Sequence, residues 1–168
     1  MAPDRERMEM AEIRQYVDIL LESLERKKGI LGMLLKENGN QEEAIRQNSD
    51  MEVFDRTVEA KSRFIAELEL LDSGFEKVYD RVREELMASR ESFKEEIIRM
   101  QRLISEITDL SVSIRTSEQR NKQLVENYFS YTKNRIRQSK KSVRAANDYY
   151  RNMRQTNFVD PQLLDRKK

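Results

Sequence analysis

Apolar residues recur at alternating intervals of four and three positions in three long stretches, a pattern that predicts amphipathic helices. The first stretch begins near Asp4 and reaches Asn38-Gly39-Asn40. Gly39 suits the left-handed conformation that ends many helices, so we expect the first helix to stop there. The stripe is interrupted at Lys27, and its main apolar members are Ile13, Val17, Leu20, Leu24, Leu31 and Leu34.

The second stretch opens with Ser49-Asp50-Met51-Glu52, which has the Ser-x-x-Glu form of a capping box. Residues 41–48 before it are ambiguous and have room for one or two helical turns. The spacing then keeps its phase through Asp72-Ser73-Gly74, so we predict one helix to about Leu86. The positions on its stripe are Phe54, Val58, Lys61, Ile65, Leu68, Asp72, Phe75, Tyr79, Val82 and Leu86.

A chain reversal is expected within residues 87–92, although the residues there also tolerate helix. A single helix over residues 50–153 would extend about 155 Å, and its stripe would lack a partner to cover it. A third helix then runs from about Ser92 to Met153, where there is neither glycine nor proline. Its stripe also carries polar residues, namely Ser111, Glu118 and Asn121.

The last part of this third helix carries only half of an apolar seam. Large apolar residues occur at every seventh position, and most positions between them are small or polar; the large ones are Phe129, Ile136, Val143 and Tyr150. Such a stripe suits transient burial by a partner better than a permanent core. After Met153 the periodicity is lost, and Pro161 favours a mobile tail.

These patterns predict an all-α protein, an elongated antiparallel bundle of three long helices with an extended C-terminal helix. Residues 1–124 form the bundle body. Residues 125–153 form a basic C-terminal extension of the last helix and the candidate substrate-binding segment. Residues 154–168 form a flexible tail.

Composition excludes much of the usual catalytic chemistry. The 168 residues contain no Cys, His or Trp, so the commonest general base and the thiolate metal ligands are missing. There is no Gly-rich phosphate loop, and adjacent acids such as Glu42 and Glu43 point about 100° apart on a helix. We expect no enzyme activity, no cofactor and no bound metal. The charged N-terminus and the lack of a long apolar window lead us to expect a cytoplasmic protein without membrane insertion.

Charge is concentrated near the C-terminus. Between Lys133 and Arg154 there are eight bases and one acid, whereas the whole chain has a net charge of +1. With the neighbouring tyrosines, this segment could contact nucleic acid or a membrane surface. The bases are spread around the helix, however, which weakens both of these alternatives. A protein partner that covers the apolar stripe is favoured.

Three stretches of the chain resemble the FlgN-like flagellar export chaperones: LLESLERKKGILGMLL, FDRTVEAKSRFIAELELLDSGFEKVYDRV and ITDLSVSIRTSEQRNKQL. The ending AANDYYRNM…FVDPQLLDRKK is similar to that of members from Gram-positive anaerobes. The resemblance covers nearly the whole chain, and its most distinctive parts are EQRNKQL (118–124) and LLDSGF (70–75).

The resemblance implies a cytoplasmic chaperone of type III flagellar export. Such proteins bind the C-terminal helical segments of hook-associated (hook–filament junction) proteins, prevent their premature assembly and deliver them to the export apparatus. The family's substrate-binding region corresponds to residues from about Leu124 to Met153. The expected apolar contacts are Val125, Phe129, Ile136, Val143 and Tyr150, and the expected cations that steer an acidic partner are Arg135, Lys140 and Arg144.

Two questions stay open at this point. The alternative function is a structural coiled-coil or adaptor protein that forms a permanent oligomer, and a homodimer is compatible with either function. The apolar residues of the predicted site could also serve packing within the chain or between two copies. The sequence does not decide whether residues 125–153 fold back, project or pair with another copy.

Overall fold

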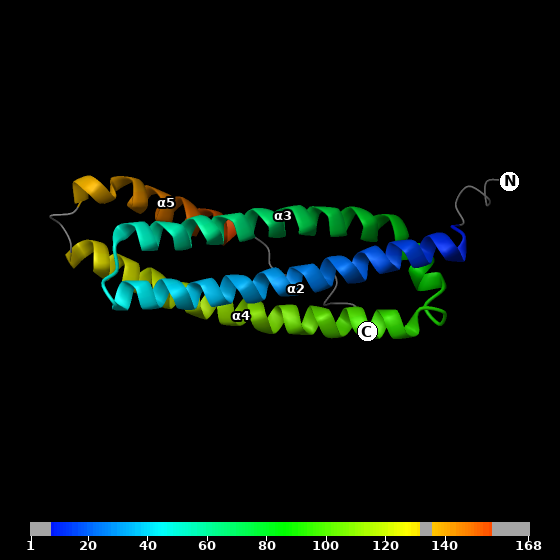
Figure 1. Ribbon diagram of the computed structural model, residues 1–168. Helices are drawn as coiled ribbons and strands as arrows, with labels where there is room; N and C mark the ends of the chain where they lie inside the picture. The colour runs from blue at the N-terminus through cyan, green and yellow to red at the C-terminus, as the bar shows by residue number, and fades with distance from the viewer. Residues whose placement is uncertain (1–7, 132–135, 156–168) are drawn as a thin grey trace.

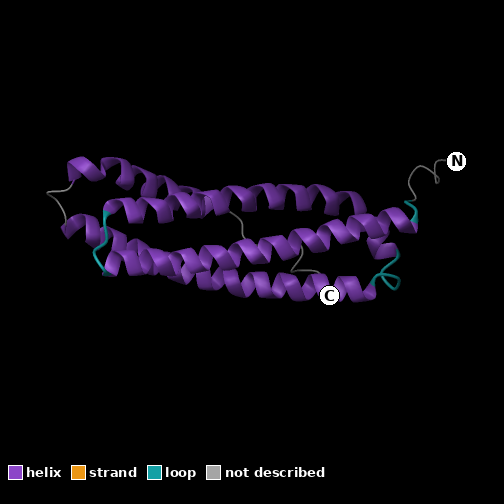
Figure 2. Ribbon diagram, in the orientation of Figure 1, coloured by secondary structure: helices purple, strands orange, loops and turns teal. Residues whose placement is uncertain are grey.

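The computed structural model describes residues 8–131 and 136–155, and within these it leaves out the side chains of residues 131, 136–141, 154 and 155. The described residues form four helices and no strand: α2 (Met10–Arg46), α3 (Met51–Ala88), α4 (Lys94–Tyr131) and α5 (Ile136–Gln155). Figure 1 shows an elongated bundle in which the three long helices lie along one axis, and Figure 2 shows the described loops at its ends. The prediction of an all-α helical bundle is therefore confirmed.

The first helix continues beyond its predicted end. Helix α2 begins at Met10 and runs through Gly39 to Arg46, and the predicted start near Asp4 lies outside the described residues. Gly39 adopts no positive φ, whereas Asn48 lies in the left-handed region with φ of 55°. The N–H of Ser49 donates to the Ala44 carbonyl and that of Asn48 to the Ile45 carbonyl, which together form a Schellman motif. Asn48 therefore terminates the helix nine residues after the predicted glycine.

The second helix confirms the continuous segment through Asp72-Ser73-Gly74, because α3 runs unbroken from Met51 to Ala88. Its start differs in detail from the prediction. The N-cap is Asp50, one residue after Ser49, and no side chain makes the capping hydrogen bond. The reversal predicted within residues 87–92 is found after Ala88, and α4 begins at Lys94.

The prediction of one helix from Ser92 to Met153 is wrong. Helix α4 ends at Tyr131, and a separate helix, α5, begins at Ile136 and runs back along the bundle (Figure 1). The physical reason lies in the stripe of the C-terminal part, which is apolar enough to pack on the bundle. Helix α5 packs against α3, and Tyr149 of α5 also bonds to α4. The C-terminal segment therefore folds back as a fourth, shorter helix instead of extending the third.

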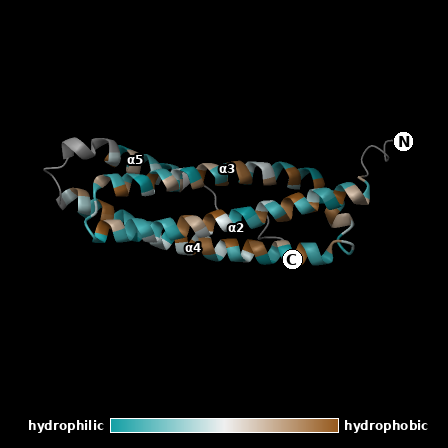
Figure 3. Ribbon diagram, in the orientation of Figure 1, coloured by the Kyte–Doolittle hydropathy of each residue, from teal (hydrophilic) through white to brown (hydrophobic). Residues whose placement is uncertain are grey.

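The core follows the predicted apolar stripes. Helix α2 packs against both α3 and α4, and every apolar stripe member predicted for the first helix is buried. Figure 3 shows hydrophobic and hydrophilic positions interspersed along each long helix, as an amphipathic helix requires. None of the described helices is long and apolar enough to cross a membrane.

Polar residues that interrupt the stripes meet each other inside the bundle. Lys27 of α2 forms an ion pair with Asp72 of α3, with 2.7 Å between Nζ and Oδ1. Lys61 of α3 forms a second ion pair with Glu118 of α4, at 3.0 Å. In both pairs a lysine that interrupts one apolar stripe meets an acid that interrupts another, which limits the cost of burying the charge.

Candidate partner-binding groove

A buried polar cluster links all four helices at the end of the bundle where α5 lies. At its centre Lys61 is fully buried, and its ammonium donates to Glu118 and, at 2.9 Å, to Oε1 of Gln41. Gln41 in turn donates to the Thr57 hydroxyl at 3.0 Å. Burial lowers the pKa of Lys61, and the neighbouring Glu118 carboxylate opposes that shift.

Two asparagines extend the cluster between α2 and α4. Asn38 donates to the Ser117 hydroxyl at 2.7 Å, and Asn121 donates to the Asn38 backbone carbonyl at 2.8 Å. Both residues are about 1% exposed. Helix α2 therefore continues past its predicted end partly because Asn38 has hydrogen-bond partners inside the bundle.

Tyr149 places α5 on this cluster. Its hydroxyl donates to Oε1 of Glu118 at 2.7 Å, and its ring lies 4.3 Å from Nζ of Lys61 in a cation–π contact. Burial, together with the Glu118 charge, raises the pKa of Tyr149 far above its usual value of 10. Among the side chains of α5 that the structure describes, Ser142 and Ala146 are also buried, and Tyr150 and Met153 pack against the core. Tyr149 thus adds a directional contact with the cluster to the apolar packing of α5.

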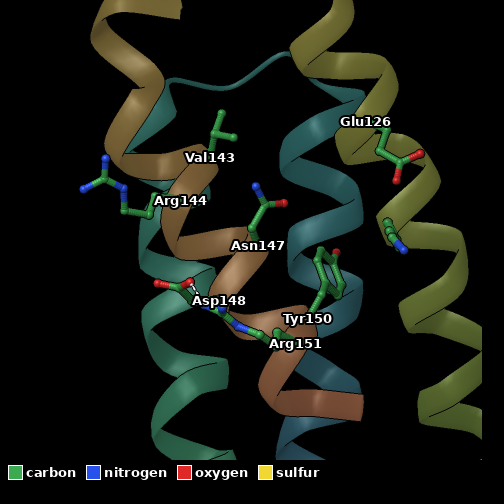
Figure 4. Close-up of a pocket in the computed structure, with 8 residues that line it drawn as sticks. Glu126, Val143, Arg144, Asn147, Asp148, Tyr150 and Arg151 are labelled. Carbon is green, nitrogen blue, oxygen red and sulfur yellow. Dashed lines mark hydrogen bonds and ion pairs between the residues drawn. The ribbon is translucent and has the colours of Figure 1, made fainter. Parts of the chain in front are cut away.

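A groove runs between α4 and α5, next to this contact. It has a volume of about 260 Å³, and a wider, shallower depression of about 710 Å³ adjoins it. Its apolar wall comes from both helices and consists of Val125, Phe129, Val143, Ala146 and Tyr150. Figure 4 shows Val143 and Tyr150 projecting from α5 on the side that faces α4. The groove is therefore apolar at its base and formed by two helices that lie apart in the sequence.

The rim of the groove is polar and carries both charges. Lys122 and Glu126 belong to α4. Figure 4 shows Asn147 on α5, between Val143 and Tyr150. In the adjoining depression Arg144 is exposed, and Arg151 pairs with Asp148 on its own helix. Such a surface could accept an apolar stripe flanked by polar residues.

Tyr150 has an unusual environment in this groove. The residue is half-buried, but its hydroxyl oxygen is buried and has no hydrogen-bond partner among the described residues. Burial and the charges of Glu118 and Glu126 raise the pKa of Tyr150 above its usual value, so the hydroxyl remains neutral and can donate.

The structure brings four of the predicted apolar site residues together: Val125, Phe129, Val143 and Tyr150 line one groove. Val125 is buried, whereas the other three are half-buried. Phe129 packs edge-to-face on Phe54 of α3, with ring centroids 5.6 Å apart. Val125, Phe129 and Tyr150 therefore also contribute to the fold itself, since Val125 belongs to the hydrophobic core and the two aromatic residues pack against it.

The predicted cations are brought together only in part. Arg144 is exposed beside the groove. Arg135 lies outside the described residues, and the side chains of Ile136 and Lys140 lie outside them as well. The sequence-based prediction for these three residues therefore stays a prediction.

The sequence-based prediction did not include Tyr149, because it placed Tyr150 on the apolar stripe of the C-terminal segment. The signal was present: Ser142, Ala146 and Tyr149 follow a 4-3 spacing of their own, one position before that of Val143 and Tyr150. Lys122 and Asn147 on the rim carried no signal, because exposed polar residues are common on any helix.

No protein-family model, curated protein or solved structure matches this chain. The likeness to FlgN-like chaperones therefore rests on the quoted sequence segments. No group of three or more acidic side chains that could hold a metal ion occurs in the part of the chain that the structure describes.

Proposed function

We propose that this chain is a non-enzymatic export chaperone of the FlgN-like type, which holds an amphipathic helix of a flagellar hook-associated protein in the groove between α4 and α5. The observation that carries the proposal is the convergence of Val125, Phe129, Val143 and Tyr150 on that groove. The spacing of the sequence and its resemblance to FlgN-like chaperones indicate the same four residues.

The chemistry of the groove suits a helical ligand. A helix can place residues spaced by three and four positions against the apolar base, while its flanks meet the polar rim. Because a groove of this size covers only part of a helix, binding would be moderate, as release at an export apparatus requires.

In a bacterial cytoplasm, such a protein would protect assembly-prone helices before export. Helices that later form the hook–filament junction carry apolar stripes that would otherwise aggregate or assemble early. The chaperone exchanges one helix partner for another and needs no nucleotide. Delivery to the type III export apparatus is part of the same proposal.

The test is co-expression of the full chain with a hook-associated protein from the same cell, followed by size exclusion with light scattering. Val143→Asp should weaken the complex by about tenfold or more, because binding would bury an unpaired carboxylate. The matched control is Val112→Asp, a valine on α4 that is 56% exposed and does not line the groove. Circular dichroism checks that both variants retain their helices.

Each outcome has a definite meaning. A wild-type complex that survives Val112→Asp and is lost with Val143→Asp supports the groove as the binding site. A complex that tolerates both substitutions places the site elsewhere. A wild-type chain that forms no complex with any hook-associated protein of its cell contradicts the flagellar function.

A further inference from the structure

Helix α5 carries two overlapping faces with the same 4-3 spacing. The face that packs on the bundle consists of Ser142, Ala146, Tyr149 and Met153. The second face consists of Val143, Ala146, Tyr150 and Met153. Neighbouring residues of a helix point about 100° apart, and half of the members are common to both faces. A rotation of α5 by about 50° about its own axis therefore exchanges one face for the other.

The second face is the more apolar of the two. It has a valine where the observed face has a serine, and it has a tyrosine in the corresponding place. In the structure Ser142 is 3% exposed, whereas Val143 is half-buried in the wall of the groove. Burying the valine in place of the serine removes more apolar surface from water. The second face is thus as suited to the core as the observed one.

Tyr149 and Tyr150 lie beside the same buried cation. Nζ of Lys61 is 4.3 Å from the centre of the Tyr149 ring and 5.6 Å from that of the Tyr150 ring. The Tyr149 hydroxyl donates to Glu118, whereas the Tyr150 hydroxyl oxygen is buried without a hydrogen-bond partner among the described residues. A rotation that takes Tyr149 away from Glu118 brings Tyr150 towards it. The carboxylate then regains a donor, and the second hydroxyl gains the partner that a buried polar group needs.

We propose that α5 rotates between two packed arrangements, the observed one with Tyr149 on Glu118 and a less populated one with Tyr150 in that place. Both arrangements keep Ala146 and Met153 on the bundle, so α5 stays part of the core. In the second arrangement Val143 and Tyr150 turn from the groove towards the core, and the polar Asn147 takes their place in the groove wall.

The rotation would control whether the groove is apolar. A partner that binds the apolar wall selects the observed arrangement, because only that arrangement presents Val143 and Tyr150. As a control of partner binding, this inference rests on the proposed function. The rotation itself is a property of the free chain and is tested there.

The experiment measures how fast a maleimide labels a single cysteine on α5 in the full chain, without a hook-associated protein. Because the chain contains no cysteine, each introduced thiol reports without background. Ser142→Cys places the thiol at a position that is buried in the observed arrangement and turns outward in the second. Val143→Cys is the matched control, because this position is half-buried in the observed arrangement and turns inward in the second. Circular dichroism checks that every variant retains its helices.

Three tyrosine variants are compared in each cysteine background. Tyr149→Phe should raise the labelling rate at position 142 by about tenfold or more, because only the observed arrangement loses a hydrogen bond to a carboxylate. Adding Tyr150→Phe should reverse most of that rise, because the second arrangement then loses the same bond. Tyr150→Phe alone should not raise the rate, since its hydroxyl has no partner in the observed arrangement. The rate at position 143 should not rise in any of the three.

The opposite results overturn the rotation. An unchanged rate at position 142 in Tyr149→Phe excludes an exchange of the two tyrosines. A rise that persists in the double variant, or that also occurs at position 143, shows that α5 only loosens from the bundle. Either result leaves the Val143→Asp test of the groove intact, and a failure of that test leaves the labelling result standing.

Discussion

The two ends of the bundle are stabilised by different chemistry. At the end where α2 begins, the three long helices bury apolar side chains such as Val17, Leu86 and Phe93, each at most 1% exposed. At the other end, α5 joins the bundle over a cluster centred on Lys61 and Glu118. Apolar burial stabilises by area and needs little direction, whereas a buried polar cluster stabilises only in one geometry.

This difference explains why function is proposed at the α5 end. A cluster of fixed geometry determines where α5 lies, and α5 in turn forms one wall of the groove. Ala146 and Tyr149 of α5 also belong to the hydrophobic core, so apolar burial and the polar cluster together hold this wall of the groove.

The largest effect is expected from breaking the ion pair at its acidic partner. Glu118→Leu leaves the Lys61 ammonium buried without its carboxylate and should lower the free energy of unfolding by about 3–5 kcal/mol. Adding Lys61→Met should recover most of that loss, because an apolar pair can replace a buried ion pair. Urea unfolding followed by circular dichroism gives both values.

The control for this pair is Glu25→Leu, since Glu25 is about half exposed and pairs with Arg99 at the surface. It should cost less than about 1 kcal/mol. If Glu118→Leu costs no more than Glu25→Leu, the cluster does not stabilise the α5 end in the way described.

A smaller and more local effect is expected at Tyr149. Tyr149→Phe keeps the ring over Lys61 but removes the hydrogen bond to the Glu118 carboxylate. Hydrogen bonds to charged groups contribute about 1.5–3 kcal/mol. Removing this one should weaken the packing of α5 on the bundle by that amount. Hydrogen exchange should show faster exchange in α5 and unchanged protection in the first half of α2. Equal loss of protection across all helices would argue against a separable α5.

The same residue predicts a pH dependence. Because the docked Tyr149 has a pKa raised above 10, it stays protonated when an undocked tyrosine would ionise. The docked state then binds more protons than the undocked state. The contribution of Tyr149 to the stability of docking is therefore fully present below pH 10 and falls as the pH rises above that value. Lys61 contributes in the opposite direction, because burial lowers its pKa in the folded chain. The unfolded chain then binds more protons than the folded chain, so this contribution to the free energy of unfolding rises with pH until a free lysine loses its proton.

Tyr149→Phe separates the two contributions. The variant should lose less stability than the native chain between about pH 9 and pH 11, measured as the urea midpoint. Tyr16→Phe, at the opposite end of the bundle, is the control and should behave like the native chain. A native chain and a Tyr149→Phe variant with the same alkaline slope would contradict the assignment.

The sequence predicted the helical faces well because apolar burial follows spacing. Ile13, Val17 and Leu20 were placed on one stripe from their intervals alone, and all three are buried. Spacing also located the polar interruptions Lys61 and Glu118, but it could not pair them. Pairing depends on the relative shift of α3 and α4, which is decided in three dimensions.

The helix ends were harder to predict, because several residues can end a helix. Gly39 has the right conformational freedom, yet Asn38 beside it finds partners in α4 and the helix continues. The separation of α4 from α5 carried no local signal, since residues 132–135 contain no helix breaker. Of the candidate site, spacing gave the groove residues Val143 and Tyr150, and missed Tyr149.

The smallest effect is expected from the surface ion pairs between α2 and α4. Lys28 and Glu106 pair in the middle of the bundle, and both side chains are more than a third exposed. Glu106→Gln should change the free energy of unfolding by less than about 1 kcal/mol, because water and salt screen such a pair. That small effect should diminish further at high salt, whereas the loss in Glu118→Leu should persist, because screening ions do not reach a buried pair. Urea unfolding of both variants at low and high salt compares a screened contact with a buried one. A similar salt response in the two variants would contradict the proposed difference between surface ion pairs and the buried cluster.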